Sequence, residues 1–104
     1  MSDVNQKYDQ AVALKDEGKL DQAVVLLEEI VAEEPDHKIA HSALAVYLQK
    51  LDRFEEAVAH AKRVVEIDPS DSFSYTQLSI ICQRCGMIQE AEDALARANM
   101  RPGQ

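Results

Sequence analysis

The sequence predicts an all-α fold, a solenoid built from three helix hairpins. Three observations predict it: an internal repeat of 34 residues, apolar residues spaced as on one face of a helix, and a shortage of turn-forming residues. The 104 residues include only three glycines and three prolines, which leaves little room for the many turns of a β-sandwich. A chain of this length can bury a core without help from a metal ion or a disulfide.

The repeat becomes visible when the sequence is written with a period of 34 residues. Pro35 and Pro69 then coincide. One column of coinciding residues is alanine in all three copies, a second holds small residues, and three others hold larger apolar residues. These columns are Ala23/Ala57/Ala91, Ala11/Ala45/Ser79, Leu14/Leu48/Cys82, Leu20/Phe54/Ile88 and Val12/Val46/Ile80. A fixed period of this length indicates similar helix pairs that stack on one another.

Six helices follow from the apolar spacing and from the residues that interrupt it. Asp21 and Ser72 are the predicted N-caps. Gly18 and Gly86 suit the left-handed residue that ends the first helix of a pair. The two aligned prolines end second helices, because proline biases the preceding residue away from the helical conformation. The predicted helices span residues 4–17, 21–33, 38–50, 55–67, 72–85 and 89–100.

The charge balance narrows the possible partners. Nineteen acidic and eleven basic residues give a net charge of −8, which disfavours nucleic acids and anionic membranes as partners. The longest apolar run, residues 43–48, is far shorter than the roughly 20 residues of a membrane-spanning helix. The first residues lack the features of a signal peptide. We therefore expect a cytoplasmic protein with reduced cysteines, and neither a nucleic acid nor a membrane as partner.

Acidic residues concentrate in the first third of the chain. Residues 1–37 carry ten acidic and three basic side chains. Several of the acids lie late in the second predicted helix and just after it: Glu28, Glu29, Glu33, Glu34 and Asp36. Such a cluster is usually a solvated outer face that aids solubility. The alternative, a docking surface for a basic partner, stays open.

Few residues are candidates for catalytic or metal chemistry. Cys82 and Cys85 form a CxxC pair, which can bind a metal or act as a redox dithiol. No second ligand pair accompanies them, however, and Cys82 falls in an apolar column, so we interpret it as a core residue. His37 and His41 lie four residues apart and His60 is alone, which favours surface or interhelix packing over ligation. Because no nucleophile motif or phosphate-binding loop is present, we expect no enzyme activity, metal or cofactor.

The repeat resembles the tetratricopeptide repeat (TPR) family over residues 4–102. The second copy carries the resemblance best, with Ala45, Tyr47-Leu48, Phe54, Glu56-Ala57, Val64 and Glu66-Ile67-Asp68-Pro69. The first copy departs from the family pattern at Lys7 and Gln10, and the third places Pro102 one residue early. The resemblance implies a single domain over residues 1–104, with repeats at about 4–37, 38–71 and 72–102. It also implies a right-handed superhelix and a role in protein–protein interaction.

In this family the first helix of each pair lines a concave groove. The groove residues implied here are Asn5, Tyr8, Val12, Lys15, Ile39, Ser42, Val46, Gln49, Phe73, Thr76, Ile80, Gln83 and Arg84. Chaperone-binding members hold a C-terminal carboxylate at positions that carry no positive charge here, namely Tyr8, Val12, Ala43, Phe73 and Gln77. We therefore expect that carboxylate clamp to be absent.

An apolar groove with a polar edge suits an apolar or amphipathic peptide or helix. The sequence thus predicts an adaptor or scaffold that binds a segment of another protein. The alternative is a structural protein that forms homo-oligomers through the same groove or its C-terminal helix. In that last helix Glu92 stands where the earlier copies have valine, so we expect the third copy to close the array with a polar face.

Overall fold

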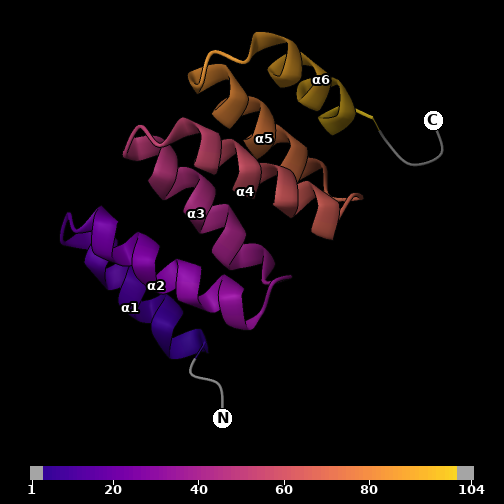
Figure 1. Ribbon diagram of the computed structural model, residues 1–104. Coiled ribbons are helices and arrows are strands. Elements are labelled where there is room, and N and C mark those ends of the chain that lie inside the picture. Colours follow the sequence, from indigo (N-terminus) through magenta and orange to yellow (C-terminus); the bar gives the residue numbers. More distant parts are fainter. Residues whose placement is uncertain (1–3, 101–104) are drawn as a thin grey trace.

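The computed structural model describes residues 4–100, and this part of the chain contains six α-helices and no strand (Figure 1). The helices are α1 (Val4–Asp16), α2 (Leu20–Glu33), α3 (Lys38–Lys50), α4 (Phe54–Ile67), α5 (Ser72–Arg84) and α6 (Ile88–Ala98). All bounds lie within two residues of the predicted ones, and the predicted all-α fold is confirmed. Pro102, at the end of the third predicted repeat, lies outside the described residues.

Consecutive helices form three hairpins, α1–α2, α3–α4 and α5–α6, which stack in chain order (Figure 1). The second helix of each hairpin packs on the first helix of the next, and α3 also touches α5. The described chain measures 42 × 30 × 19 Å. The stack is therefore elongated, with α1–α2 and α6 at opposite ends, and its first helices lie next to one another along one face.

The turns inside the three hairpins share one geometry. Gly18 and Gly86 have φ angles of 80° and 78°, as predicted, and Asp52 has a φ of 60° at the equivalent position. In each turn the backbone N–H of the following residue donates to a carbonyl five residues earlier, at 2.8–2.9 Å. This bond satisfies a carbonyl at the end of the first helix. Asp52 therefore adopts a conformation that favours glycine.

The predicted N-caps at Asp21 and Ser72 are wrong. α2 begins one residue earlier than expected, directly after the glycine turn, and its cap position is Lys19, whose side chain makes no capping hydrogen bond. The cap of α5 is Asp71, whose carboxylate accepts a hydrogen bond from the backbone N–H two residues on, at 3.0 Å. His37 caps α3 by accepting from a backbone N–H at 3.1 Å. A histidine cap has no strong sequence signal, because Ser, Thr, Asp and Asn are the usual caps.

Small residues lie where the two helices of a hairpin cross. Ala11 and Ala23 are fully buried between α1 and α2, and Ala45 and Ala57 occupy the equivalent positions between α3 and α4. In the third hairpin Ser79 takes the place of alanine. Its hydroxyl donates to the backbone carbonyl of the facing helix at 2.8 Å, so the buried polar group is satisfied.

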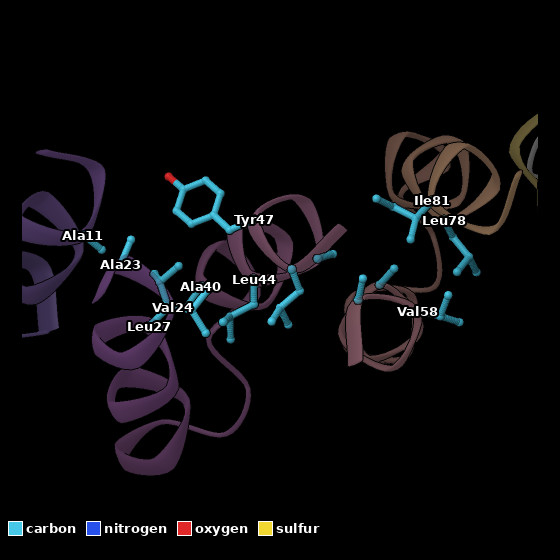
Figure 2. Close-up of a cluster of buried hydrophobic side chains, with 14 of the residues drawn as sticks. Ala11, Ala23, Val24, Leu27, Ala40, Leu44, Tyr47, Val58, Leu78 and Ile81 are labelled. Carbon is cyan, nitrogen blue, oxygen red and sulfur yellow. The ribbon is translucent and has the colours of Figure 1, made fainter. Parts of the chain in front are cut away.

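Larger side chains fill the space between successive hairpins and form one continuous core. In Figure 2, Val24 and Leu27 of α2 lie beside Ala40 of α3. Further along the stack, Val58 of α4 points toward Leu78 of α5. The core thus runs within each hairpin and across neighbouring repeats, and no hairpin could bury its apolar face alone.

Two histidines that the sequence did not connect form a pair between α3 and α4. The ring of His41 is buried, and its Nδ1 lies 2.9 Å from Nδ1 of His60. The Nε2 of His41 lies 2.7 Å from the carbonyl oxygen of Pro35. A carbonyl only accepts, so the neutral His41 ring carries its hydrogen on Nε2 and accepts at Nδ1 from His60. Burial, and secondly the neighbouring His41, lower the pKa of His60, and Glu56 partly opposes this.

We expect Asp52→Gly to stabilise the protein by up to about 1 kcal/mol, because it removes the penalty of a left-handed residue while adding some unfolded-state entropy. The converse change, Gly86→Ala, should cost about 1 kcal/mol. A Cβ at Gly86 would meet no atom within 4 Å, so that cost is conformational alone. Urea denaturation measures both. Destabilisation by Asp52→Gly would show that the Asp52 side chain contributes a stabilising contact.

Enlarging the contact between α3 and α4 should destabilise the second hairpin. Ala57 has no exposed surface, and Ala57→Leu is expected to overpack the crossing at a cost of about 1–3 kcal/mol. Ala59→Leu is the matched control, since Ala59 is exposed on the same helix and both residues favour helix. Thermal unfolding of the two variants tests the register of the repeat. Equal melting temperatures would mean that Ala57 does not set the helix approach.

The histidine pair should make stability depend on pH. A histidine with a lowered pKa in the folded state binds a proton more readily once the chain unfolds, so acid favours unfolding. The loss of stability begins as the pH falls through 6.5, the ordinary pKa of histidine, and is complete below the pKa of His60 in the folded state. We expect the free energy of unfolding to fall between about pH 7.5 and pH 5.

Urea denaturation at both pH values measures this loss, and His60→Gln should reduce it. The window stays above the range in which carboxylates titrate, so His60 is separated from the acids whose pKa values are lowered. If His60→Gln and the wild type lose the same free energy on acidification, the pair does not govern the response.

Candidate functional site

Two neighbouring depressions run along the face formed by the first helices. One lies between α1 and α3 and is lined by Tyr8, Lys38, Ile39, Ser42, Ala43, Val46 and Tyr47. The other lies between α3 and α5, has a volume of about 400 Å3, and is lined by Ser42, Val46, Gln49, Lys50, Phe73, Thr76, Gln77, Ile80, Ile81 and Arg84. Ser42 and Val46 border both, so the two depressions form one surface, which we call the first-helix groove.

The structure brings together most of the predicted groove residues. Nine of the thirteen line one of the two depressions: Tyr8, Ile39, Ser42, Val46, Gln49, Phe73, Thr76, Ile80 and Arg84. Asn5, Val12, Lys15 and Gln83 line neither. Val12 is partly buried, and Lys15 pairs with Asp16 at 3.1 Å, which raises the pKa of Lys15.

Exposure differs among the apolar groove residues. The expected ridge of Val12, Val46 and Ile80 is uneven: Ile80 is 45% exposed, whereas the two valines are partly buried. The most exposed apolar side chains are instead Phe73 at 81% and Ile39 at 59%. Val46 packs against the core as well as lining the groove, whereas Val12 lines neither depression. Phe73, Ile80 and Ile39 are therefore the apolar groups that a partner could cover at least cost to the fold.

Hydrogen bonds across the groove hold α3 against α5. The hydroxyl of Ser42 donates to Oε1 of Gln77 at 3.0 Å, and Nε2 of Gln77 donates back to the Ser42 carbonyl at 3.3 Å. Nearer the helix ends, Arg84 donates to Oε1 of Gln49 at 3.2 Å. These bonds fix the width of the α3–α5 depression. The sequence did not indicate them, because each joins residues 35 apart whose proximity depends on the stacking.

The N-terminal end of the groove carries a compact ionic cluster. Nζ of Lys38 lies 2.6 Å from Asp71 and 3.1 Å from Asp68, in the loop before α5. The hydrogen bond from Lys38 holds the pKa of Asp71 below its ordinary value, helped by a second from Ser74. Asp71 and Asp68 in turn raise the pKa of Lys38. Lys38 is thus occupied within the protein and links the second hairpin to the third.

The chemistry-bearing residues singled out in the sequence do not assemble into a reactive centre. Cys82 is fully buried in the core, as interpreted, and Cys85 lies at the end of α5. Burial raises the pKa of both thiols, which disfavours the reactive thiolate form. Within residues 4–100 no three histidine, cysteine or carboxylate side chains are placed to share a metal ion. The described helices also include none that is long and apolar enough to cross a membrane.

Comparison with known proteins identifies the family. A family model described as tetratricopeptide repeat matches residues 14–79. The chain belongs to the tetratricopeptide repeat family. The match reaches from α1 into α5, and the six helices of the described chain account for three TPR units.

Solved structures share the TPR fold over nearly the whole chain. The second TPR of Spaghetti (RPAP3), bound to the HSP90 peptide SRMEEVD, is 18% identical with a TM-score of 0.82, and the match covers 93% of this chain and 90% of that one. MamA from Desulfovibrio magneticus RS-1 is 22% identical with a TM-score of 0.81, over 92% of this chain. MamA AMB-1 is 23% identical with a TM-score of 0.82, over 94%.

The chain spans only 54% and 58% of those two MamA chains. At these identities the likeness shows the fold, an all-α TPR solenoid as predicted. None of the curated proteins compared with the chain matches it.

Proposed function

We propose that this TPR protein is an adaptor or scaffold that binds a peptide or helix of a partner protein in the first-helix groove. The observation that carries the proposal is the exposure of Phe73, Ile80 and Ile39 along a hollowed face of a TPR fold. Large apolar side chains that gather in a concave surface are typical of interaction sites. The role is binding rather than catalysis, and the cytoplasmic location stays a prediction.

The volume of the α3–α5 depression supports a short segment as the partner. A hollow of about 400 Å3 falls in the range of sites that enclose a few side chains. The structurally similar Spaghetti TPR is described with a bound HSP90 peptide, so this fold can hold a peptide. The uncharged residues at the clamp positions, among them Phe73 and Gln77, favour a different way of holding the segment here.

Self-association is the second candidate, and one observation favours it. Leu95 of α6 is 48% exposed and Ile88 is 54% exposed. Leu27 and Ala61, which occupy the Leu95 position in the earlier repeats, are buried under the next hairpin. The end of the stack therefore combines the predicted exposed Glu92 with two uncovered apolar side chains. Sedimentation over a range of concentrations separates the candidates, since a strict monomer excludes self-assembly.

A carboxylate in the groove should prevent partner capture without unfolding the chain. We choose Ile80→Glu because Ile80 is exposed, so the charge stays in contact with water and the fold should tolerate it. Val46 is a poorer choice, since it is partly buried and its loss would also disturb the core. Affinity capture with wild type and variant, quantified by mass spectrometry beside circular dichroism, measures both effects.

Val25→Glu is the matched control, because Val25 is 54% exposed on α2 and lines neither depression. We expect Val25→Glu to retain its partners. Ile80→Glu should capture the same partners at least tenfold less, which corresponds to about 1.4 kcal/mol of binding free energy. Native helicity with undiminished capture by Ile80→Glu would place the interface elsewhere.

A further inference from the structure

We propose that the segment bound in the first-helix groove is apolar with an acidic end. Its large apolar side chains fill the α3–α5 depression, and its aspartate or glutamate side chains lie against Lys50 and Arg84. This inference depends on the proposed function of the groove. It adds the chemistry of the partner segment and the place of its acidic end.

The first evidence is the distribution of acidic residues among the helices. The whole chain carries 19 acids in 104 residues, so about five would fall in the 26 residues of α3 and α5 at the average frequency. These two helices contain none, whereas each of the other four contains at least two. Neither depression is lined by an acidic side chain. In an acidic protein, the two depressions are thus lined without any acidic side chain, and the aspartates at the end of the groove are already paired with Lys38.

The second evidence is the position of the positive charges. Lys50 and Arg84 are 34 residues apart, lie in the last turns of α3 and α5, and both line the same depression. At the equivalent place in the first repeat stands Asp16, which pairs with Lys15. The basic edge is therefore confined to the α3–α5 depression.

These two cations are also available, unlike the lysine at the other end of α3. Lys38 is engaged by two aspartates. Within residues 4–100 neither Lys50 nor Arg84 forms an ion pair, and the guanidinium of Arg84 donates to the neutral side chain of Gln49. Both side chains are exposed. A carboxylate arriving from a partner would find two cations that no carboxylate of the described chain already occupies.

The apolar lining of the α3–α5 depression determines which other side chains the partner segment needs. Phe73 and Ile80 supply exposed apolar surface beside the basic edge, so the segment needs large apolar side chains next to its acids. A strongly acidic segment would be repelled by the net charge of −8. At physiological ionic strength that repulsion is screened beyond roughly 8 Å, and the local attraction of Lys50 and Arg84 remains. One or two acids at one end satisfy both conditions.

Selection from a phage-displayed library of random 12-residue peptides, with the full chain as bait, tests the inference. We expect enriched peptides to place one or two acids beside large apolar residues. The double variant Lys50→Glu/Arg84→Glu should bind their synthetic forms roughly tenfold or more weakly, because two ion pairs are lost and replaced by repulsion. Replacing the peptide acids with lysine should restore binding to the double variant. Circular dichroism verifies that each variant is folded.

The matched control is Lys19→Glu/Lys62→Glu, which changes the net charge equally at exposed lysines outside both depressions and should leave affinity within twofold. A second variant, Lys50→Gln/Arg84→Gln, removes the attraction without adding repulsion and should give a smaller loss.

The outcomes separate this inference from the proposed function. If peptides bind Ile80→Glu more weakly but bind Lys50→Glu/Arg84→Glu as well as the wild type, the groove remains the binding site. The proposal of an acidic end is then wrong. Peptides indifferent to both changes, or a selection without any binder sensitive to Ile80→Glu, would overturn both proposals. Self-association of the free chain that the charge reversal abolishes would make a second copy the occupant and would likewise overturn the inference.

Discussion

The close approach of the two helices in each hairpin is the constraint on which the rest of the structure depends. Alanine or serine at each crossing leaves no large side chain to hold the helices apart. The larger residues lie beside the crossing, and part of their apolar surface meets the next hairpin. Packing inside a repeat thus creates the apolar flank that makes stacking necessary. This constraint is visible in the sequence as an alanine at the same position of all three repeats, namely Ala23, Ala57 and Ala91.

Stacking in turn produces the groove. Second helices pack on the following first helices, so α3 also touches α5, and α1 and α3 line a common depression. The side chains of these first helices toward the groove have no further layer to cover them. Val46 shows the compromise, since it contributes to the core and also borders both depressions. Phe73 stands beyond the core and is 81% exposed, so the repeat architecture does not need it there.

The periodic features of the molecule were predictable from the sequence, and the contacts across repeats were not. The 34-residue period and the helical spacing can be read from residues that occupy equivalent positions in the repeats. They therefore predicted the helices, the crossings and the left-handed glycines. The His41–His60 pair joins two residues of different columns on different helices. The Ser42–Gln77 bonds likewise need the distance between α3 and α5. Sequence reasoning also missed Lys50, because the family resemblance pointed to other groove positions.

The N-caps failed for a related reason. In the hairpin turns the positive-φ residue and its hydrogen bond already set the direction of the chain, so α2 and α4 begin at once without a capping side chain. The longer loops between hairpins lack that device. There the helices begin at His37 and Asp71, whose side chains accept the backbone bond. Capping residues therefore mark the boundaries between repeats, whereas glycine or Asp52 marks the turn within one.

The helices of the three repeats have similar positions in the fold but differ in charge. The hairpins share one turn geometry, yet α2 carries four acids, whereas α3 and α5 carry none. A uniform solubilising charge would spread over all exposed positions, since a soluble fold needs charge on its surface but not at particular helices. Acidic side chains lining the α3–α5 depression would add desolvation cost to any apolar contact made with Phe73 and Ile80. The absence of acids from the lining of both depressions therefore supports the proposed contact there, and the repeat supplies the rigid frame for that contact.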